Sequence, residues 1–322
     1  MSQNLSPQSS MPPLSAGNVV TAALGIYRSH LKLYFGIALR ATLWLLLSCV
    51  PLIPLPLIFI SRPPNYGLLL LILPIWLIFY IYCLAKYFAN SAAISRLAFV
   101  ELINQPESVH SARSHVIPRM WTFLRAGFLA GLIVFLVNIG ISIATNLVLV
   151  LPAAILTGSS RGNSGGSVIL VLLQITKFIV DLFVQLWIQS RYFILELPIA
   201  IEDNVDASQA LGRSWDLTKG LVLRIQSTLL VAGLIIIPLI GIGLIPLVVI
   251  APFIIAFASR NQAFLPIIIG LSMAFIAILI GFAITVALPF WQSIKAVIYY
   301  DLRTRREGLG LQLREIPKDK LR

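Results

Sequence analysis

Two rows of polar side chains interrupt apolar runs that are long enough to cross a membrane. The first row consists of Asn138, Ser142 and Thr145. The second row consists of Gln174, Lys177, Asp181 and Gln185. Each spacing places the members of a row on one face of a helix. Polar faces at membrane depth turn away from lipid, so we expect both rows to face the helix bundle.

These rows allow two interpretations, which are hydrogen bonding between helices or a polar pathway for a solute, a proton or a lipid headgroup. Lys177 and Asp181 are one helical turn apart. Counted from Arg191 at about 1.5 Å per residue, they lie roughly 15–20 Å into a core of about 30 Å. A lone charge there costs about 2.5–3.5 kcal/mol. The sequence therefore predicts a Lys177–Asp181 pair, with Gln174 and Gln185 above and below it.

Acidic residues cluster just after the fourth apolar run, at Glu196, Glu202, Asp203 and Asp206. The adjacent carboxylates of Glu202 and Asp203 could bind a cation or a basic partner. The alternative is a solvated loop that is neutralised by Arg191 and Arg213.

The next segment, Ala207–Lys219, is predicted to form a short amphipathic helix. Asp206 is its expected N-cap, Gln209 completes a capping box, and Gly220 ends the helix. Trp215 falls on the apolar face, so the helix lies either on the membrane surface or as a platform beneath the spans. The candidate interface for a cytosolic partner comprises Arg191, Glu202, Asp203, Arg213, Trp215, Asp216 and Lys219.

Enzyme signatures would have to come from the histidines, hydroxyl residues and glycines. His110 and His115 are five residues apart, which does not align them on one helical face as a metal pair requires. Serines and threonines have no neighbouring base, and no Lys-Ser/Thr pair follows the glycines of the fifth run. We therefore predict a protein that is not an enzyme and binds neither cofactor nor metal.

One run of residues resembles a known family. The segment Ala210–Gly220, ALGRSWDLTKG, resembles the integral membrane domain attached to some bacterial glycerophosphoryl diester phosphodiesterases. Similar blocks occur at Tyr299–Gly308 and, more weakly, at Leu24–Arg40. The family often has Asp after the final Gly-apolar pair, where this chain has Gly310. The resemblance implies a stand-alone, multi-spanning membrane domain that lacks the catalytic domain.

Composition leads to the same class of protein without the resemblance. Hydrophobic residues make up 58% of the 322 residues and charged residues 11%, whereas soluble domains are about 25% charged. The apolar runs do not alternate as barrel strands do. We predict an all-α polytopic protein with six spans, at Phe35–Ile60, Gly67–Ala89, Gly127–Leu156, Val168–Tyr192, Ser227–Ala258 and Phe264–Tyr299.

The net charge of +12 could indicate nucleic-acid binding, but the distribution of the basic residues argues against it. Twenty of the 24 lie on one side of the predicted membrane, three lie on the other, and Lys177 lies within a span. The positive-inside rule then places both termini in the cytosol, at a bacterial cytoplasmic membrane.

Three copies of one unit, a surface helix followed by two spans, are predicted at residues 15–103, 104–204 and 205–302. The surface helices are Ser15–His30, Asn104–Ile117 with a capping box of Asn104 and Glu107, and Asp206–Lys219. Membrane hairpins that merely look alike are the alternative.

A disordered tail at 1–14 and a basic tail at 303–322 flank the six-span domain. Prolines in the fifth span predict a kinked helix or a discontinuous one.

Three functional classes are consistent with these features. The first is a non-catalytic membrane module that scaffolds or regulates a partner in lipid or envelope metabolism. The second is a small transporter, channel or lipid translocator that uses the polar rows. The third, an intramembrane enzyme, lacks a recognisable set of catalytic residues. Membrane lipids and a protein on the cytosolic face are the expected partners.

Overall fold

The computed structural model describes residues 15–52, 66–152, 164–260 and 265–308. Within them the chain forms helices and turns and no strand. The elements are α1 (Ala16–Ser29), α2 (Leu31–Cys49), η1 (Val50–Leu52), α4 (Tyr66–Leu102), α5 (Val109–Val116), η2 (Ile117–Arg119), α6 (Met120–Thr145), η3 (Asn146–Val150), α8 (Ser164–Tyr192), α9 (Glu196–Ile201), α10 (Ala207–Thr218), α11 (Val222–Arg260) and α12 (Leu265–Glu307). The tail at 1–14 and most of the tail at 303–322 lie outside the described residues.

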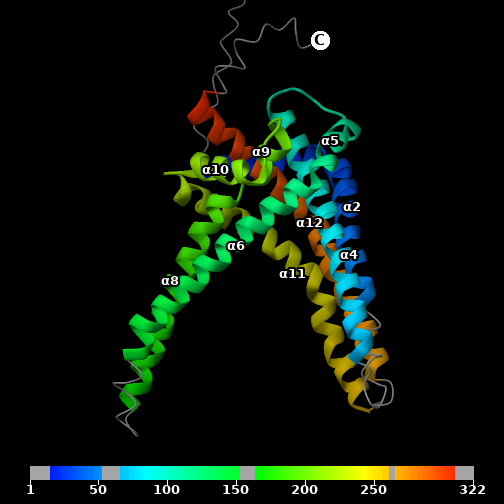
Figure 1. Ribbon diagram of the computed structural model, residues 1–322, viewed down its shortest axis with the longest axis vertical. Coiled ribbons are helices and arrows are strands. Elements are labelled where there is room, and N and C mark those ends of the chain that lie inside the picture. The colour runs from blue at the N-terminus through cyan, green and yellow to red at the C-terminus, as the bar shows by residue number, and fades with distance from the viewer. Residues whose placement is uncertain (1–14, 53–65, 153–163, 261–264, 309–322) are drawn as a thin grey trace, which may run out of the picture.

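The long helices form two legs that diverge beneath a roof of short helices (Figure 1). The hairpin leg consists of α6, η3 and α8, and the bundle leg consists of α2, α4, α11 and α12. The roof consists of α1, α5, α9 and α10. Helix α11 starts against α8 beneath the roof and runs across to α12 in the bundle leg. A wedge therefore opens between the legs, away from the roof.

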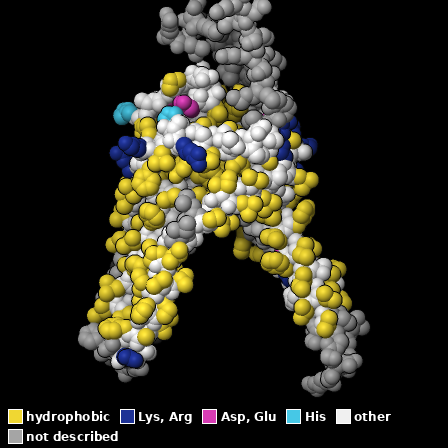
Figure 2. All heavy atoms as spheres, turned by 180° about the vertical axis from the view of Figure 1, so that it is seen from behind, with side chains coloured by type: hydrophobic (Ala, Val, Ile, Leu, Met, Phe, Trp, Pro, Cys, Tyr) yellow, Lys and Arg dark blue, Asp and Glu magenta, His cyan; other side chains and the backbone are white. Residues whose placement is uncertain are grey.

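The surfaces of the legs are apolar, as a membrane requires. Figure 2 shows hydrophobic side chains over both legs, while Lys and Arg gather near the roof. Among the described residues, five helical stretches are long and apolar enough to cross a membrane, and the number is six if the bent pair of α10 and α11 counts as one span. The all-α polytopic fold is confirmed, with five to six spans in place of a fixed six.

The structure distinguishes between the two alternatives for the fifth span. Helix α11 stays continuous through Pro238, Pro246 and Pro252, so the discontinuous alternative is wrong. Each proline removes one internal hydrogen bond, and the neighbouring turns maintain the helix. The sharp bend in this region lies instead before α11, where α10 meets Val222–Pro238 at 94°.

Two predicted helix ends are wrong. Helix α4 runs to Leu102, well past Ala89, because Ala89, Ala92 and Ala93 are fully buried and let it pack closely against its neighbours near the roof. Helix α12 likewise runs past Tyr299 to Glu307, so the predicted basic tail begins as helix. Hydropathy marks where an apolar run stops, and a helix can continue beyond that point.

The starts of two surface helices differ in how well the sequence predicts them. Ser15 is the N-cap of α1, and its hydroxyl accepts the Asn18 N–H at 3.2 Å. The predicted capping box of Asn104 and Glu107 is wrong, because Ser108 caps α5 and accepts the Ser111 N–H at 3.1 Å. Asn104 adopts a positive φ of 55° at the end of α4.

The three surface helices each pack on a different part of the bundle. Helix α5 packs on α4, α10 packs on α6 and α8, and α1 packs on α11 and α12. Each thus covers the hairpin that precedes it in the chain, with the first helix covering the last hairpin. This cyclic order is compatible with three repeats of one orientation, which stay a prediction.

Candidate functional site

The predicted pair of ionisable residues is present in α8. The Lys177 Nζ donates to Asp181 Oδ2 at 2.5 Å, and both side chains are largely covered by protein, with 16% and 32% of their surface exposed. Local helix geometry accounts for the contact, since residues four apart face one another. The other carboxylate oxygen, Asp181 Oδ1, is buried and has no hydrogen-bond partner among the described residues.

The two polar rows meet at one point between α6 and α8. The Asn138 Nδ2 donates to Gln185 Oε1 at 2.5 Å and also reaches the carbonyl of Val134. In antiparallel helices this contact sets the register, so that Ser142 lies level with Asp181. One turn further, Asn146 at the start of the π-helical η3 lies level with Lys177. Such π-helical turns are frequent at functional sites.

The rest of the two rows does not converge as predicted. Gln174 is exposed on the surface of α8, so its inward orientation is wrong. Thr145 is buried, but its hydroxyl donates to the Ile141 carbonyl of its own helix at 2.9 Å. A serine or threonine hydroxyl in a helix can donate its hydrogen bond to a carbonyl in the preceding turn of the same helix. A row of polar residues therefore need not form bonds between two helices.

In the roof, Glu202 joins three helices. It follows α9, and its Oε1 accepts hydrogen bonds from Arg213 of α10 at 3.1 Å and from the Tyr299 hydroxyl of α12 at 2.7 Å. Arg213 also pairs with Glu307 at the end of α12, at 2.5 Å. The predicted neutralisation of Glu202 by Arg213 is therefore confirmed.

Two arginines bond to the carboxyl end of α9. Arg119 donates to the carbonyl oxygens of Ile199 at 3.0 Å and Glu202 at 2.7 Å, and Arg96 donates to that of Ala200 at 2.6 Å. Cations stabilise this end of a helix because its last carbonyls are unpaired and carry partial negative charge. Arg119 also pairs with Asp203 at 3.3 Å.

The expected role of Arg191 is wrong. Among the described residues it pairs with no carboxylate; its guanidinium lies 4.6 Å from the ring centroid of Trp215 and 5.1 Å from that of Trp187. The attraction between a guanidinium and an aromatic face is stronger when the pair is shielded from water than when it is exposed. The Ser214 hydroxyl donates to the Arg191 carbonyl at 2.7 Å, so α10 is held to the end of α8 by several contacts.

Helix α10 has the predicted start and capping box, and it ends at Thr218, one residue before the predicted end at Lys219. Gln209 Oε1 accepts the Asp206 N–H at 3.0 Å, and Gly220 has a positive φ of 75°. As part of the roof, the helix packs against α6 and α8, which confirms the platform. Asp216 and Lys219 are exposed, and neither side chain has an ion-pair partner in the part of the chain that the structure describes.

We expect Trp215→Ala to lower the free energy of unfolding by about 2 kcal/mol, because the ring contacts Trp187, Tyr192 and Arg191. Unfolding in mixed micelles measures the change. The control is Gln209→Ala on the same helix, which removes one cap and should cost about 0.5–1 kcal/mol. Equal, negligible losses from both variants would contradict the anchoring role of Trp215.

A further ion pair was not predicted from the sequence. Glu196 at the start of α9 accepts from Lys295 of α12 at 2.9 Å, although the two residues are 99 positions apart. Their side chains are 15% and 20% exposed. In the sequence, Glu196 belongs to the acidic cluster and Lys295 lies near the end of a predicted span. No sequence signal connects them, because the contact depends on how α9 and α12 cross.

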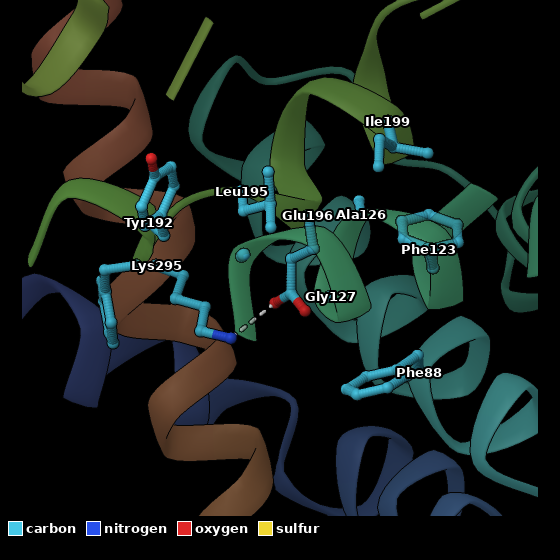
Figure 3. A pocket seen from close by; sticks show the side chains of 11 residues that line it. Phe88, Phe123, Ala126, Gly127, Tyr192, Leu195, Glu196, Ile199 and Lys295 are labelled. Carbon is cyan, nitrogen blue, oxygen red and sulfur yellow. Dashed lines mark hydrogen bonds and ion pairs between the residues drawn. The ribbon is translucent and has the colours of Figure 1, made fainter. Parts of the chain in front are cut away.

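This pair borders a cavity of about 270 Å³ between α4, α6, α9 and α12 (Figure 3). We call it the apex cavity, because these helices meet where the legs diverge (Figure 1). The bundle leg contributes Phe88 and Lys295, the hairpin leg contributes Phe123 and Gly127 among others, and the roof contributes Glu196. The cavity therefore lies where all three parts of the fold meet. Its wall is mainly apolar, with one cation and one anion.

Glu107, which precedes α5, has a pKa below its ordinary value of 4.5. Burial alone would raise this pKa, but hydrogen bonds from Arg96 at 2.8 Å and from the Ser111 hydroxyl at 2.7 Å lower it, as does the positive charge of Arg96. The ionised form is thus favoured in the folded protein.

We expect Glu107 to stabilise the fold fully above pH 4.5 and to lose this contribution as the pH falls below 4.5 through its lower, folded-state pKa. Glu107→Gln should remove this acid-dependent part of the stability. Thermal midpoints of both proteins between pH 3 and pH 7 measure the difference. Parallel pH profiles for the variant and the wild type would contradict this role.

Comparison with known proteins gives no match: the chain matches no family model, and no curated protein or solved structure matches it significantly. The resemblance to the phosphodiesterase membrane domain consequently stays a prediction. The function is therefore inferred from the geometry of the described residues.

Proposed function

We propose that this protein is a non-catalytic, multi-pass module of the bacterial cytoplasmic membrane that scaffolds or regulates a partner in lipid or envelope metabolism. The observation that carries the proposal is the bonding of Glu202, which connects the end of α9 to α10 and α12. Bonds of this kind hold helices in one relative position. A fixed surface on one side of the membrane is what a scaffold offers to a partner.

The exposed edge of α10 is the proposed contact with the partner. Asp216 and Lys219 lie there without ion-pair partners among the described residues, whereas Arg213 on the same helix is engaged by Glu202 and Glu307. Free charges at the rim of an interface select and orient a partner. The positive-inside rule supports a cytosolic position for this edge and for both termini.

Purification from native membranes after mild solubilisation tests the proposal. We expect one enzyme of lipid or envelope metabolism to co-purify with the wild type in a fixed ratio. It should be lost from the double variant Asp216→Lys, Lys219→Glu, whose unfolding midpoint should equal that of the wild type because both side chains are exposed. Retention of the enzyme by the double variant, or absence of any such enzyme, would contradict the proposal.

A lipid translocator is the second candidate, and the polar contact inside the hairpin leg favours it. Asn138, Gln185, Lys177 and Asp181 place amide and charged groups between or along two helices that stand apart from the bundle. Proteoliposomes with fluorescent phospholipids distinguish the candidates. A protein-dependent increase in lipid flip-flop that Asp181→Asn abolishes would favour the translocator, and an unchanged rate would favour the scaffold.

A further inference from the structure

The apex cavity contains two opposite charges whose bonding capacity is only partly used. An ammonium group has three donors and a carboxylate has two oxygens. In the described part of the chain, Lys295 donates to Glu196 Oε1 alone, and no hydrogen bond to Glu196 Oε2 is present. The remaining wall consists of aromatic and small side chains, including Phe88, Phe123 and Gly127.

Partly buried charges are stable only when they are paired and further hydrogen-bonded. The two side chains are 15% and 20% exposed, and no atom of either is a buried polar atom without a partner among the described residues, so a ligand that enters the cavity can reach both charged groups. A ligand that brings an anion for Lys295 and a cation for Glu196 would complete both groups at once. A purely anionic ligand would be attracted by Lys295 and repelled by Glu196, 2.9 Å away.

We propose that the apex cavity binds the headgroup of a zwitterionic phospholipid, one that carries a phosphodiester and a primary ammonium. The phosphate lies at Lys295, the ammonium lies at Glu196, and the acyl chains extend between the legs. This site goes beyond the proposed scaffolding function and does not depend on it.

The size and the position of the cavity agree with this ligand. A volume of about 270 Å³ is at the small end of ligand pockets, which begin near 300 Å³, and holds a headgroup rather than a whole lipid. The cavity is lined by residues of α4, α6, α9 and α12, which meet beneath the roof where the legs diverge (Figure 1), and the leg surfaces on which acyl chains would lie are apolar (Figure 2). The ring of Phe193, 5.5 Å from Lys295 Nζ, adds an aromatic face next to the charges.

Gly127 offers a way to fill the cavity without touching the ion pair. A Cβ atom there would meet the Phe88 ring at 3.7 Å, an ordinary contact, so a longer side chain would extend into the cavity. Gly131, one turn further along α6, is exposed and would meet nothing within 4 Å. The variants Gly127→Leu and Gly131→Leu therefore carry the same change at a lining and at a non-lining position.

Binding to the purified full chain in detergent tests the site. The probes are short-chain phosphatidylethanolamine, phosphatidylglycerol with the same chains, and free phosphoethanolamine. We expect phosphatidylethanolamine to bind at least about tenfold more tightly than the other two, which corresponds to about 1.4 kcal/mol. Gly127→Leu should weaken its binding at least about tenfold, whereas Gly131→Leu should bind as the wild type does.

The ion pair is tested separately through the double variant Glu196→Gln, Lys295→Met, which leaves no charge unpaired and should fold. It should bind both lipids equally weakly. Equal affinities of the wild type for the two lipids, or equal affinities of the two leucine variants, would overturn the proposal. Equally tight binding of free phosphoethanolamine would also overturn it, because the acyl chains would then contribute nothing.

Discussion

Replacing either member of the Lys177–Asp181 pair alone is expected to destabilise the protein by about 3 kcal/mol. Each single change, Lys177→Ala or Asp181→Ala, leaves the other charge without its 2.5 Å partner near the middle of the predicted span. An uncompensated charge at that depth costs about 2.5–3.5 kcal/mol on insertion scales, and breaking a buried pair costs about 3–5 kcal/mol. The loss should be similar for both variants.

The double variant Lys177→Met, Asp181→Leu should recover most of this loss, since nothing unpaired remains. Unfolding in mixed micelles, analysed as a double-mutant cycle, measures the coupling between the two residues. Gln174→Leu is the matched control, because Gln174 is exposed on the same helix and should have little effect. If either single variant were as stable as the wild type, the pair would contribute nothing to the fold.

Glu202→Ala is the second change for which we expect a large effect, again about 3 kcal/mol. It removes the acceptor of the Tyr299 hydroxyl, a side chain that is fully buried, and one acceptor of Arg213. A buried donor without a partner costs about 1–3 kcal/mol, and hydrogen bonds to charged groups contribute about 1.5–3 kcal/mol. The roof should loosen as a result, so protease sensitivity between α9 and α10 should rise.

Two variants make this prediction specific. Glu202→Gln keeps an oxygen that can accept from Tyr299 and should lose less stability than Glu202→Ala. Asp203→Ala changes the next residue, whose side chain is 79% exposed and pairs with Arg119. An exposed pair contributes about 0–1 kcal/mol, so this variant should stay close to the wild type. Equal losses at positions 202 and 203 would contradict the special role of Glu202.

The sequence predicted those features that depend on neighbours along the chain. The capping box of α10 and the contact between Lys177 and Asp181 both follow from the geometry of one helix, and both are present. The contacts of Glu196 with Lys295 and of Glu202 with Tyr299 join residues 99 and 97 positions apart. They depend on the crossing of α9 and α12, which no local pattern determines.

The divergence of the legs could not be predicted for a related reason. Hydropathy identifies α6 and α8 as apolar helices, but lipid and protein neighbours satisfy an apolar surface equally well. The prediction that Gln174 faces the bundle was wrong for the same reason, since one face of α8 is not covered by protein. Buried polar residues next to the roof, such as Tyr299, by contrast, must be hydrogen-bonded because they are removed from both water and lipid.

The central claim is that two legs cross the membrane beneath a roof that lies on a single side. Labelling of single cysteines with an impermeant maleimide tests it most directly, in a background of Cys49→Ser and Cys83→Ala. Ser208 is exposed in the roof, and Leu151 and Ser259 are exposed near the far ends of the two legs. We expect Leu151→Cys and Ser259→Cys to react in intact cells, and Ser208→Cys to react only after permeabilisation. Reaction of all three cysteines from the same side would contradict the account.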